Sequence, residues 1–403
     1  MQHPPVTDFA TDFDHTDEAW VADPYPIMED LRERCPIAHS ERYGGMWAPM
    51  THEAVSAIAN DTEHFTSRTV VITEGRPGDD APPAPIGVAP PISSDPPFHE
   101  VARRLLLPAF APRPVNALEG FSRDLCTSLI DDMGDAEVID ASLQYTQHIP
   151  VGVIAKMVGL PPADGDLFRH FVHEIIEAVD LPVEERIARF QPIEEYIVGL
   201  IEDHRANPTD DLISYLLDVE IGGNKLLDEH VFGTIVLLIV AGIDTTWSAI
   251  GSSLWHLAQN PDDLARLVAH PELIPSAVEE FLRAYAPVTM ARLVKEDFEF
   301  QGCPMKKDDW ILLSFPAANR DPEFFDNADQ VLIDREINRH SAFGLGIHRC
   351  LGSNLARLEM VVAIEEFIRR FPRFELADPS AVTFSQGQVR GPRSLPIRIL
   401  ERA

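Results

Sequence analysis

The sequence has few cysteines and few basic residues for its length. Its four cysteines, Cys35, Cys126, Cys303 and Cys350, lie far apart in 403 residues and form no Cys-x-x-Cys pair. This spacing argues against a zinc site or a disulfide framework and fits a reducing compartment. Lysine and arginine number 33 against 65 acidic residues, which gives a formal charge of −32. So acidic a chain argues against binding to nucleic acid or to an anionic membrane.

The sequence also lacks a long uninterrupted apolar run. No window reaches the roughly 18 consecutive apolar residues that span a bilayer. The longest candidate, residues 231–243, contains Gly and Thr and ends at Asp244, so we expect a buried helix and no membrane insertion. The N-terminus has neither the basic start nor the apolar core of a secretory signal. We therefore expect a cytoplasmic protein.

Apolar residues at a spacing of 3.6 dominate the chain and predict a mainly α fold with a minor β region. Nothing in the sequence marks a linker between autonomous domains. The expected helices are residues 23–36, 52–60, 98–110, 115–133, 146–158, 164–178, 182–207, 210–217, 228–260, 262–270, 274–284 and 354–370. The expected strands are a hairpin within residues 37–48, split by two glycines, and residues 298–300, 310–315 and 395–400.

Residues 76–97 contain eight prolines, which is too many for a regular helix or a central strand. The segment is expected to be a long loop. Loops of this length are usually disordered or functional, and both a disordered segment and a lid over a binding site remain open.

A glycine-punctuated loop, residues 341–352, carries Cys350 and leads directly into a helical pattern. Gly344 and Gly346 allow tight turns and a close approach to a large flat partner. Backbone N–H groups at a helix start lower the pKa of a thiol, so we expect Cys350 to be a thiolate. A thiolate is a nucleophile or a metal ligand, and the residues alone do not choose between the two.

The spacing Phe-Gly-x-Gly-x-His-x-Cys-x-Gly in this loop resembles the haem-ligand loop of the cytochrome P-450 family. The resemblance implies haem b with the Cys350 thiolate as the axial iron ligand. It also implies the family's triangular helical fold around a buried haem. Residues 1–403 would then form one haem domain, with a small β-rich lobe, a large helical lobe and no fused reductase.

The longest helical pattern contains Ala241-Gly242-Ile243-Asp244-Thr245-Thr246. Gly and Thr are unfavourable inside a helix, so one interpretation is that two helices meet here with Asp244 as an N-cap. Alternatively, the helix opens locally to admit oxygen. The string resembles the family's oxygen-activating motif, which implies that Asp244 and Thr245 relay protons.

Two further groups of residues gain meaning from the resemblance. Glu280 and Arg283 form an i, i+3 pair of a kind common on exposed helices. In the family such a pair is a structural brace beneath the haem, and Arg335 is expected to join it. Four other residues match the positions that bind the haem propionates, although each alone would be read as a surface charge: His99, Arg103, Arg292 and His348.

The resemblance implies a monooxygenase that hydroxylates or O-dealkylates a substrate, using O2 and electrons from a separate ferredoxin or flavodoxin with its NAD(P)H-dependent reductase. Arg349 and Arg357 are candidates for the docking patch. The alternatives are a peroxygenase driven by H2O2 and a non-catalytic haem-based sensor or binding protein. The Asp244–Thr245 pair argues against the peroxygenase, because peroxide already supplies oxygen at its two-electron-reduced level.

The residues expected to line the substrate pocket are small or aliphatic, which indicates a small, mostly apolar organic substrate such as a terpenoid or an aromatic compound. Arg68 or Arg76 would instead suit a substrate that carries a carboxylate. The sequence does not decide between an apolar and an acidic substrate. The expected pocket residues are Leu237, Leu238, Ala241, Val288, Thr289 and Met290.

Overall fold

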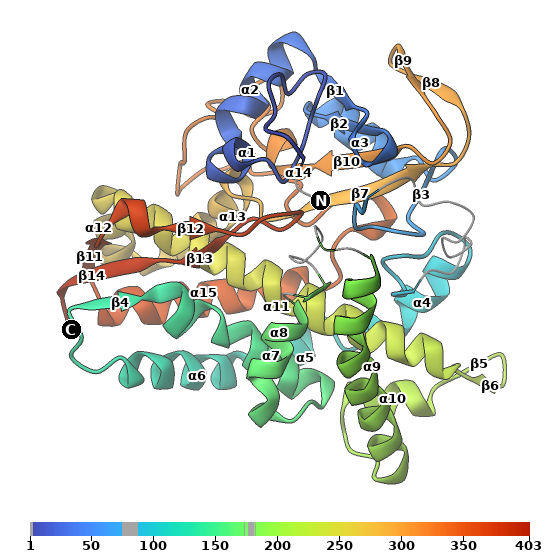
Figure 1. Cartoon of the computed structure of the whole chain (residues 1–403). Coiled ribbons are helices and arrows are strands. Elements are labelled where there is room, and N and C mark those ends of the chain that lie inside the picture. The colour runs from blue at the N-terminus through green and yellow to red at the C-terminus, as the bar shows by residue number, and fades with distance from the viewer. Residues whose placement is uncertain (1–2, 75–87, 173, 176–180, 182) are drawn as a thin grey trace.

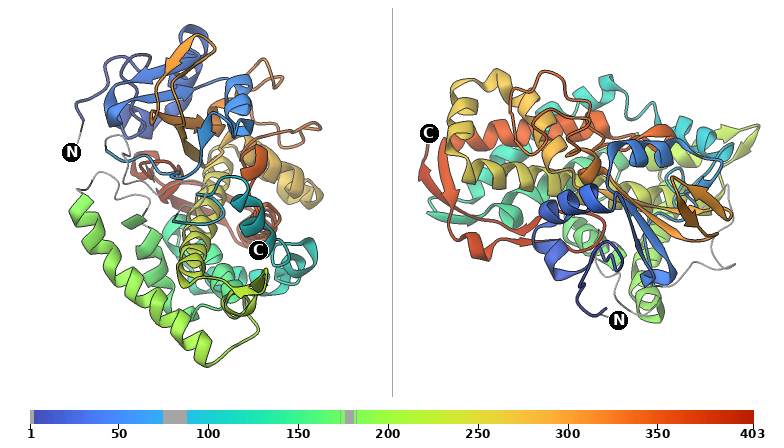
Figure 2. Two further views of the ribbon diagram at one scale, coloured as in Figure 1. Left: turned by 90° about the vertical axis from the view of Figure 1, so that its right-hand side faces the viewer. Right: turned by 90° about the horizontal axis from the view of Figure 1, so that it is seen from above.

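The structure is a computed structural model that describes residues 3–74, 88–172, 174, 175, 181 and 183–403. With 52% of the residues helical, it confirms the mainly α class with a minor β region. A small lobe built on a sheet lies against a larger helical lobe, and the outline in Figure 1 is roughly triangular. Figure 2 shows the same division from the side, with the long helix α9 at the edge of the helical lobe.

Helices and strands follow one another along most of the described residues, whereas residues 319–352 contain no α-helix or strand. The helices are α1 (Glu18–Ala22), α2 (Pro24–Arg34), α3 (His52–Asn60), α4 (Phe98–Leu106), α5 (Pro112–Asn116), α6 (Glu119–Asp132), α7 (His148–Val158), α8 (Gly165–Val172), α9 (Val183–Ala206), α10 (Leu212–Asp218), α11 (Asp228–Gln259), α12 (Pro261–Ala269), α13 (Ile274–Ala284), α14 (Phe315–Ala318) and α15 (Ser353–Arg370). The strands are β1 (Ile37–Ser40), β2 (Met46–Pro49), β3 (Phe65–Thr66), β4 (Val138–Asp140), β5 (Glu220–Ile221), β6 (Asn224–Lys225), β7 (Thr289–Val294), β8 (Phe298–Phe300), β9 (Cys303–Met305), β10 (Trp310–Ser314), β11 (Arg373–Leu376), β12 (Thr383–Phe384), β13 (Pro392–Ser394) and β14 (Pro396–Glu401).

The small lobe is organised by a five-stranded sheet in the order β1-β2-β10-β7-β3. Successive residues of β10 point to opposite faces. Trp310 and Leu312 pack into one hydrophobic cluster, and Ile311 and Leu313 pack into another. Because both faces are covered, this strand is apolar from Trp310 to Leu313. The predicted hairpin is present as β1 and β2, which pair antiparallel.

α11 is the central helix of the molecule and contacts α7, α8, α9, α13 and α15. Its N-terminal half packs into one helical cluster and its C-terminal half into a second. By length and composition α11 is also capable of crossing a membrane, but 61% of its most apolar window is buried inside the protein. This burial agrees with the predicted core helix.

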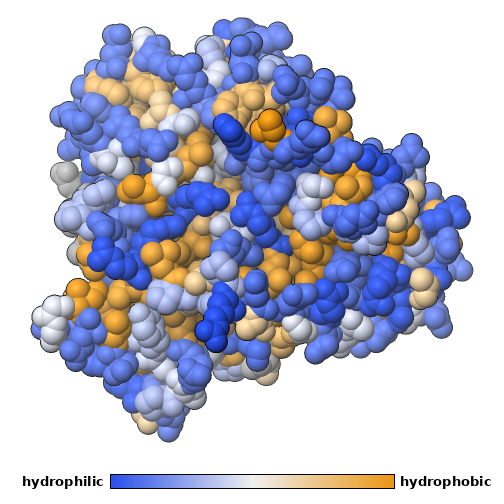
Figure 3. Space-filling view, turned by 180° about the vertical axis from the view of Figure 1, so that it is seen from behind, coloured by the Kyte–Doolittle hydropathy of each residue, from blue (hydrophilic) through white to orange (hydrophobic). Residues whose placement is uncertain are grey.

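The molecular surface is largely polar. The face in Figure 3 is mostly hydrophilic, with apolar side chains in scattered groups. This distribution is what the formal charge of −32 leads one to expect.

Candidate active site

The cysteine loop is closed by its own backbone and by α3. The Cys350 N–H donates to the Phe343 carbonyl at 2.7 Å, and Gly344 and Gly346 have φ values of +70° and +66°. A Cβ on Gly346 would lie 2.5 Å from the Ala59 carbonyl oxygen in α3. The close approach that requires glycine at position 346 is therefore to another part of the protein, which the sequence did not reveal.

The lowering of the Cys350 pKa expected from the helix start is present, but burial outweighs it. Burial raises the pKa of the Cys350 thiol, although the Gly352 N–H and the charge of Arg103 act in the opposite direction. The residue itself retains exposed surface. A metal ion deprotonates the thiol that coordinates it, so bound iron would favour the thiolate form of Cys350.

Cationic and imidazole side chains from three segments meet beside this loop. The rings of His99 (α4) and His348 lie 4.4 Å apart, and Arg292 of β7 is buried. Burial lowers the pKa of His348 to about 2, with further lowering by Arg292, His99 and Arg103. Burial also lowers the pKa of Arg292 to about 10.

These groups have few anionic partners among the described residues. His99 Nε2 is buried without a hydrogen-bond partner, and Arg103 donates to the Arg349 carbonyl at 2.7 Å. Asp95, the carboxylate that acts on His99 and Arg292, already accepts hydrogen bonds from the Thr66 hydroxyl and the Ser67 N–H. The cluster is thus short of negative charge, and the two propionates of a haem fit this requirement.

Ser67 is a member of this cluster that sequence reasoning missed. Its Oγ lies 3.0 Å from His348 Nε2, and its N–H donates to Asp95 at 2.9 Å. No local motif distinguishes this serine, because its partners are 28 and 281 residues away in the chain.

The motif in α11 lies inside an unbroken helix, so the alternative of two helices meeting at an Asp244 N-cap is excluded. Ala241 is exposed and Thr245 is half-buried, while Asp244 is buried. The Thr245 hydroxyl donates to the Ala241 carbonyl at 2.8 Å. A Cβ on Gly242 would lie 2.5 Å from the Ile154 side chain, so glycine here admits close packing of α7.

Asp244 is paired with a residue that sequence reasoning did not single out. Its Oδ1 accepts a hydrogen bond of 2.5 Å from Arg393 of β13. An isolated arginine in a Pro-Arg-Ser segment 149 residues downstream carries no signal of this contact.

The structure brings Glu280, Arg283 and Arg335 together. Glu280 accepts two hydrogen bonds of 2.8 Å from Arg283 and one of 2.9 Å from Arg335. The Glu280 and Arg283 side chains are both fully buried. Burial would raise the pKa of Glu280, but the hydrogen bonds from both arginines lower it overall.

The expected pocket residues differ in their surroundings. Leu237 and Val288 are half-buried, whereas Leu238 packs into the cluster of α7 and α8. Met290 is also half-buried and packs against a small-lobe cluster. The Thr289 hydroxyl donates to the Gln388 carbonyl at 3.2 Å.

Two of the arginines proposed for carboxylate recognition and docking form ion pairs within the protein. Arg68 forms an ion pair with Asp308, and Arg76 lies outside the described residues. Arg357 donates to both oxygens of Glu279, at 2.6 and 2.9 Å.

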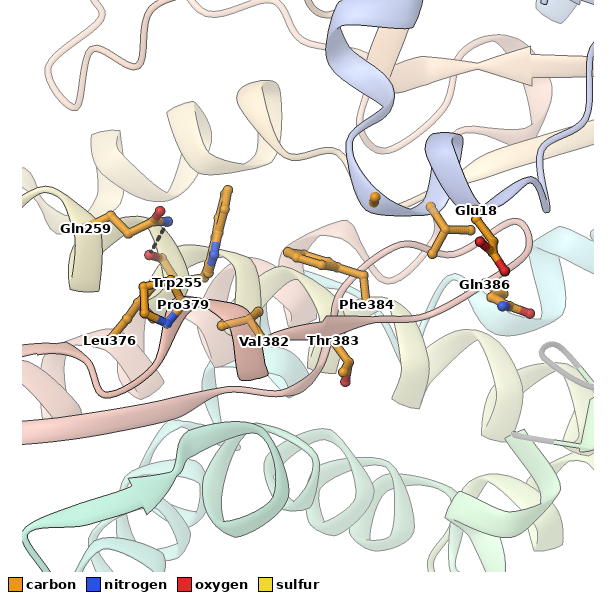
Figure 4. A pocket seen from close by; sticks show the side chains of 11 residues that line it. Glu18, Trp255, Gln259, Leu376, Pro379, Val382, Thr383, Phe384 and Gln386 are labelled. Atoms are coloured by element: carbon orange, nitrogen blue, oxygen red, sulfur yellow. Dashed lines mark hydrogen bonds between the residues drawn. The ribbon is translucent and has the colours of Figure 1, made fainter. Parts of the chain in front are cut away.

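A groove with a volume of about 460 Å³ lies at the base of the C-terminal hairpin, which is formed by the antiparallel strands β12 and β13 (Figure 4). Trp255 and Phe384 line it, with Glu18 at its far end. None of the described residues that line this groove belongs to the cysteine loop, the Asp244 region or the Glu280 cluster, so the groove is separate from the candidate active site.

A family model described as cytochrome P450 matches residues 165–390. The chain belongs to the cytochrome P450 family. The polyketide biosynthesis cytochrome P450 PksS of Bacillus subtilis is 36% identical over 312 residues, covering 76% of this chain and 77% of that protein. Cytochrome P450-terp of a Pseudomonas species is 34% identical, covering 93% of each chain.

Solved structures agree with this assignment. The crystal structure of CYP109E1 from Bacillus megaterium in complex with testosterone has a TM-score of 0.85 and 30% identity, covering 94% of this chain and 98% of that one. The predicted P450 fold is therefore confirmed. The protein is a P450 monooxygenase whose cofactor is haem b, bound through the cysteine thiolate of the Cys350 loop.

Proposed function

We propose that this P450 hydroxylates or O-dealkylates a small, mostly apolar terpenoid or aromatic substrate. The observation that carries the proposal is the accessible part of α11 at Ala241 and Thr245, in a helix that is otherwise largely buried. The aliphatic residues Leu237 and Val288 are half-buried and add apolar surface. The names of relatives, P450-terp and the testosterone complex of CYP109E1, support an apolar ligand.

A neutral substrate is favoured over a carboxylate. Arg68 is already paired with Asp308 through Nη2, although its buried Nε has no hydrogen-bond partner among the described residues. A carboxylate beside it would either displace Asp308, which costs free energy, or lie close to that carboxylate and be repelled by it.

The propionates of the haem would be held by His99, Arg103, Arg292 and His348. Each of these side chains is positively charged or can donate a hydrogen bond, and their cluster contains little negative charge. Bound carboxylates would reduce the repulsion that now lowers the pKa of His348. Ser67 would keep the His348 ring in place through its 3.0 Å contact.

When bound, haem supplies the activation of O2, and its thiolate ligand favours cleavage of the O–O bond. The protein's part is to deliver protons to the accessible side of α11. We assign this to the Asp244 carboxylate and the Thr245 hydroxyl. Because the Thr245 hydroxyl donates its hydrogen bond to the Ala241 carbonyl oxygen, the lone pairs of Oγ1 remain available to accept one from a ligand or a water molecule.

Electrons would come from a ferredoxin or flavodoxin reduced by an NAD(P)H-dependent reductase. Arg349 is exposed beside Cys350 and is our candidate for contact with an acidic partner. Arg357 is held by Glu279, so it contributes less free charge to such a surface.

Two measurements test the proposal. The reduced holoenzyme under carbon monoxide should show the strongly red-shifted band of thiolate ligation, and Cys350→His should lose it. Limonene, camphor, testosterone, 4-methoxybenzoic acid and lauric acid are then compared by spectral shift and by product formation with NADH, ferredoxin and reductase. Conversion of the neutral compounds supports the proposal, whereas exclusive conversion of the acids contradicts it. Full turnover with H2O2 alone, and none with the redox partner, would establish the peroxygenase instead.

A further inference from the structure

The guanidinium group of Arg393 contacts one face of α11 at three places. Nη2 donates to Asp244 Oδ1 at 2.5 Å, and Nη1 donates to Ser248 Oγ at 3.1 Å. The group also lies 4.2 Å from the centroid of the Trp247 ring. These residues share a helix face through their i, i+3, i+4 spacing. The Asp244 side chain is 1% exposed and that of Arg393 is 15% exposed, so solvent screens this ion pair only weakly.

The backbone that carries this arginine is fixed against the helical lobe. The Pro392 carbonyl accepts a hydrogen bond of 2.8 Å from Ser142 Oγ, which in turn accepts one of 2.8 Å from Trp247 Nε1. A Cβ on Gly391 would lie 2.3 Å from the Ser248 side chain, so the hairpin presses directly on α11. The Arg393 side chain is therefore held at both ends, by the backbone that packs on α11 and by the contacts of its guanidinium group.

The same hairpin reaches the region proposed for the substrate. The Thr289 N–H donates to the Gln388 carbonyl at 2.8 Å, and Val288 and Val389 form an antiparallel bridge. The segment from Gln388 to Arg393 thus connects the start of β7 with Asp244.

We infer that Arg393 is a positioning residue for the proton relay, which it controls by holding the Asp244 carboxylate against the hairpin. The inference rests on the proposed role of Asp244 and adds a residue to it. A buried carboxylate is costly without a cationic partner, so Arg393 stabilises the Asp244 carboxylate and fixes its direction. Successive helix residues are about 100° apart around the axis. The carboxylate must therefore loosen its contact with Arg393, or use a water molecule, to reach the side on which Thr245 lies.

The test uses the holoenzyme with ferredoxin, reductase and NADH, and with limonene or testosterone, whichever is converted faster. Coupled turnover consumes one substrate, O2, NADH and H⁺ and yields hydroxylated product, water and NAD⁺. Uncoupled turnover yields H2O2 and NAD⁺ from O2, NADH and H⁺. For Arg393→Gln we expect product per NADH to fall on the order of tenfold, with matching H2O2, while the substrate-induced spectral shift is retained. Arg393→Lys should restore most of the coupling.

A double-mutant cycle with Asp244→Asn decides whether Arg393 acts through Asp244. The double variant D244N/R393Q should be no less coupled than D244N alone. Ser248→Ala removes only the second anchor of the guanidinium and should reduce coupling severalfold in the wild-type background but not in D244N. Arg390→Gln is the matched control, because Arg390 lies in the same hairpin and packs on Phe384 instead.

Additive losses in the cycle would overturn the inference. So would a loss of coupling in the control R390Q as large as that in R393Q. If D244N is uncoupled while R393Q and S248A are fully coupled, the positioning role is refuted and the Asp244 relay stands. If D244N itself stays fully coupled, the proposed relay and the inference both fail.

Discussion

Thr245 combines an accessible position in the centre of the molecule with a hydroxyl that is already oriented. Its proton is directed at the Ala241 carbonyl one turn earlier, which leaves the oxygen lone pairs facing away from the helix backbone. A methyl group cannot reproduce this acceptor. The role of Thr245 is therefore separable from the packing of α11.

We predict that Thr245→Ala leaves substrate binding largely intact but diverts electrons from product to H2O2. Loss of one proton-delivering group typically costs 10²- to 10⁴-fold in the step that it assists. The measurement is product formed per NADH, with the spectral shift on substrate addition as the check on binding. Thr245→Ser keeps the hydroxyl and should retain coupling. Unchanged coupling in the alanine variant would refute the relay role.

His15 is a buried group whose protonation opposes folding. Both of its ring nitrogens are buried without a hydrogen-bond partner, and its ring lies 5.3 Å from that of Tyr43. Burial lowers its pKa to about 4, against a small opposing effect of Asp14. The unfolded chain therefore binds more protons than the folded one between pH 6.5 and 4, and stability falls as the pH falls through this range.

We predict that His15→Phe makes the free energy of unfolding less sensitive to acid. The difference between pH 7 and pH 4 should shrink by up to about 3 kcal/mol relative to the wild type. Urea unfolding at pH 7, 5.5 and 4 measures it, because other titrating groups cancel in the comparison. His270→Phe, at an exposed position, is the control and should leave the pH dependence unchanged.

At the scale of elements, Glu280 ties α13 to the segment that leads to the cysteine loop. Its carboxylate accepts hydrogen bonds from Arg283, Arg335, the Leu332 N–H and Asn338. Arg283 also donates to the carbonyls of Asn319 and Ala328. Backbone that has no regular secondary structure of its own is thereby held in one shape.

We predict that Glu280→Gln destabilises the holoenzyme by about 3–5 kcal/mol, because it leaves buried arginine charge without its counter-ion. Glu100→Gln is the matched control, since its carboxylate is 75% exposed in its i, i+4 pair with Arg104 and should cost about 1 kcal/mol or less. Thermal unfolding followed by circular dichroism and by the haem absorbance compares the two variants. Equal losses would contradict the special role of Glu280.

The elements differ in how far the sequence alone predicts them. α13 and α11 were predicted almost to the residue, because their apolar periodicity is long and local. β7 was missed, because Thr289–Val294 is defined by its pairing with β10 and β3 and shows no clear alternation. The same limit applies to the site. Cys350 and Glu280 lie in recognisable spacings, whereas Ser67 and Arg393 become part of the site only through contacts made across the fold.

At the scale of the whole molecule, the groups proposed to bind the propionates come from both lobes. Arg292 belongs to the sheet of the small lobe, while His99 and Arg103 belong to α4 and His348 to the cysteine loop. Their mutual effects on pKa show that these charges repel one another without a ligand. An anionic cofactor placed among them would draw the two lobes together.

We predict that haem raises the unfolding temperature of the apoprotein more than haem dimethyl ester does, since the ester carries no propionate charge. Hydrogen bonds to charged groups are each worth about 1.5–3 kcal/mol. Arg103→Gln should reduce the difference between the two cofactors. Arg104→Gln, at the neighbouring exposed position paired with Glu100, should not. Equal unfolding temperatures with both cofactors would contradict the assignment of the cluster.

The parallel pairing of β2 with β10 has a consequence for the order of events during synthesis. Met46 pairs with Trp310, so the N-terminal hairpin must wait for a partner about 260 residues further along the chain. At roughly 5–20 residues per second, this wait lasts on the order of 13–50 seconds on the ribosome. Until then the edge of β2 that β10 will cover has no partner strand. This edge is where we expect a chaperone to be needed most.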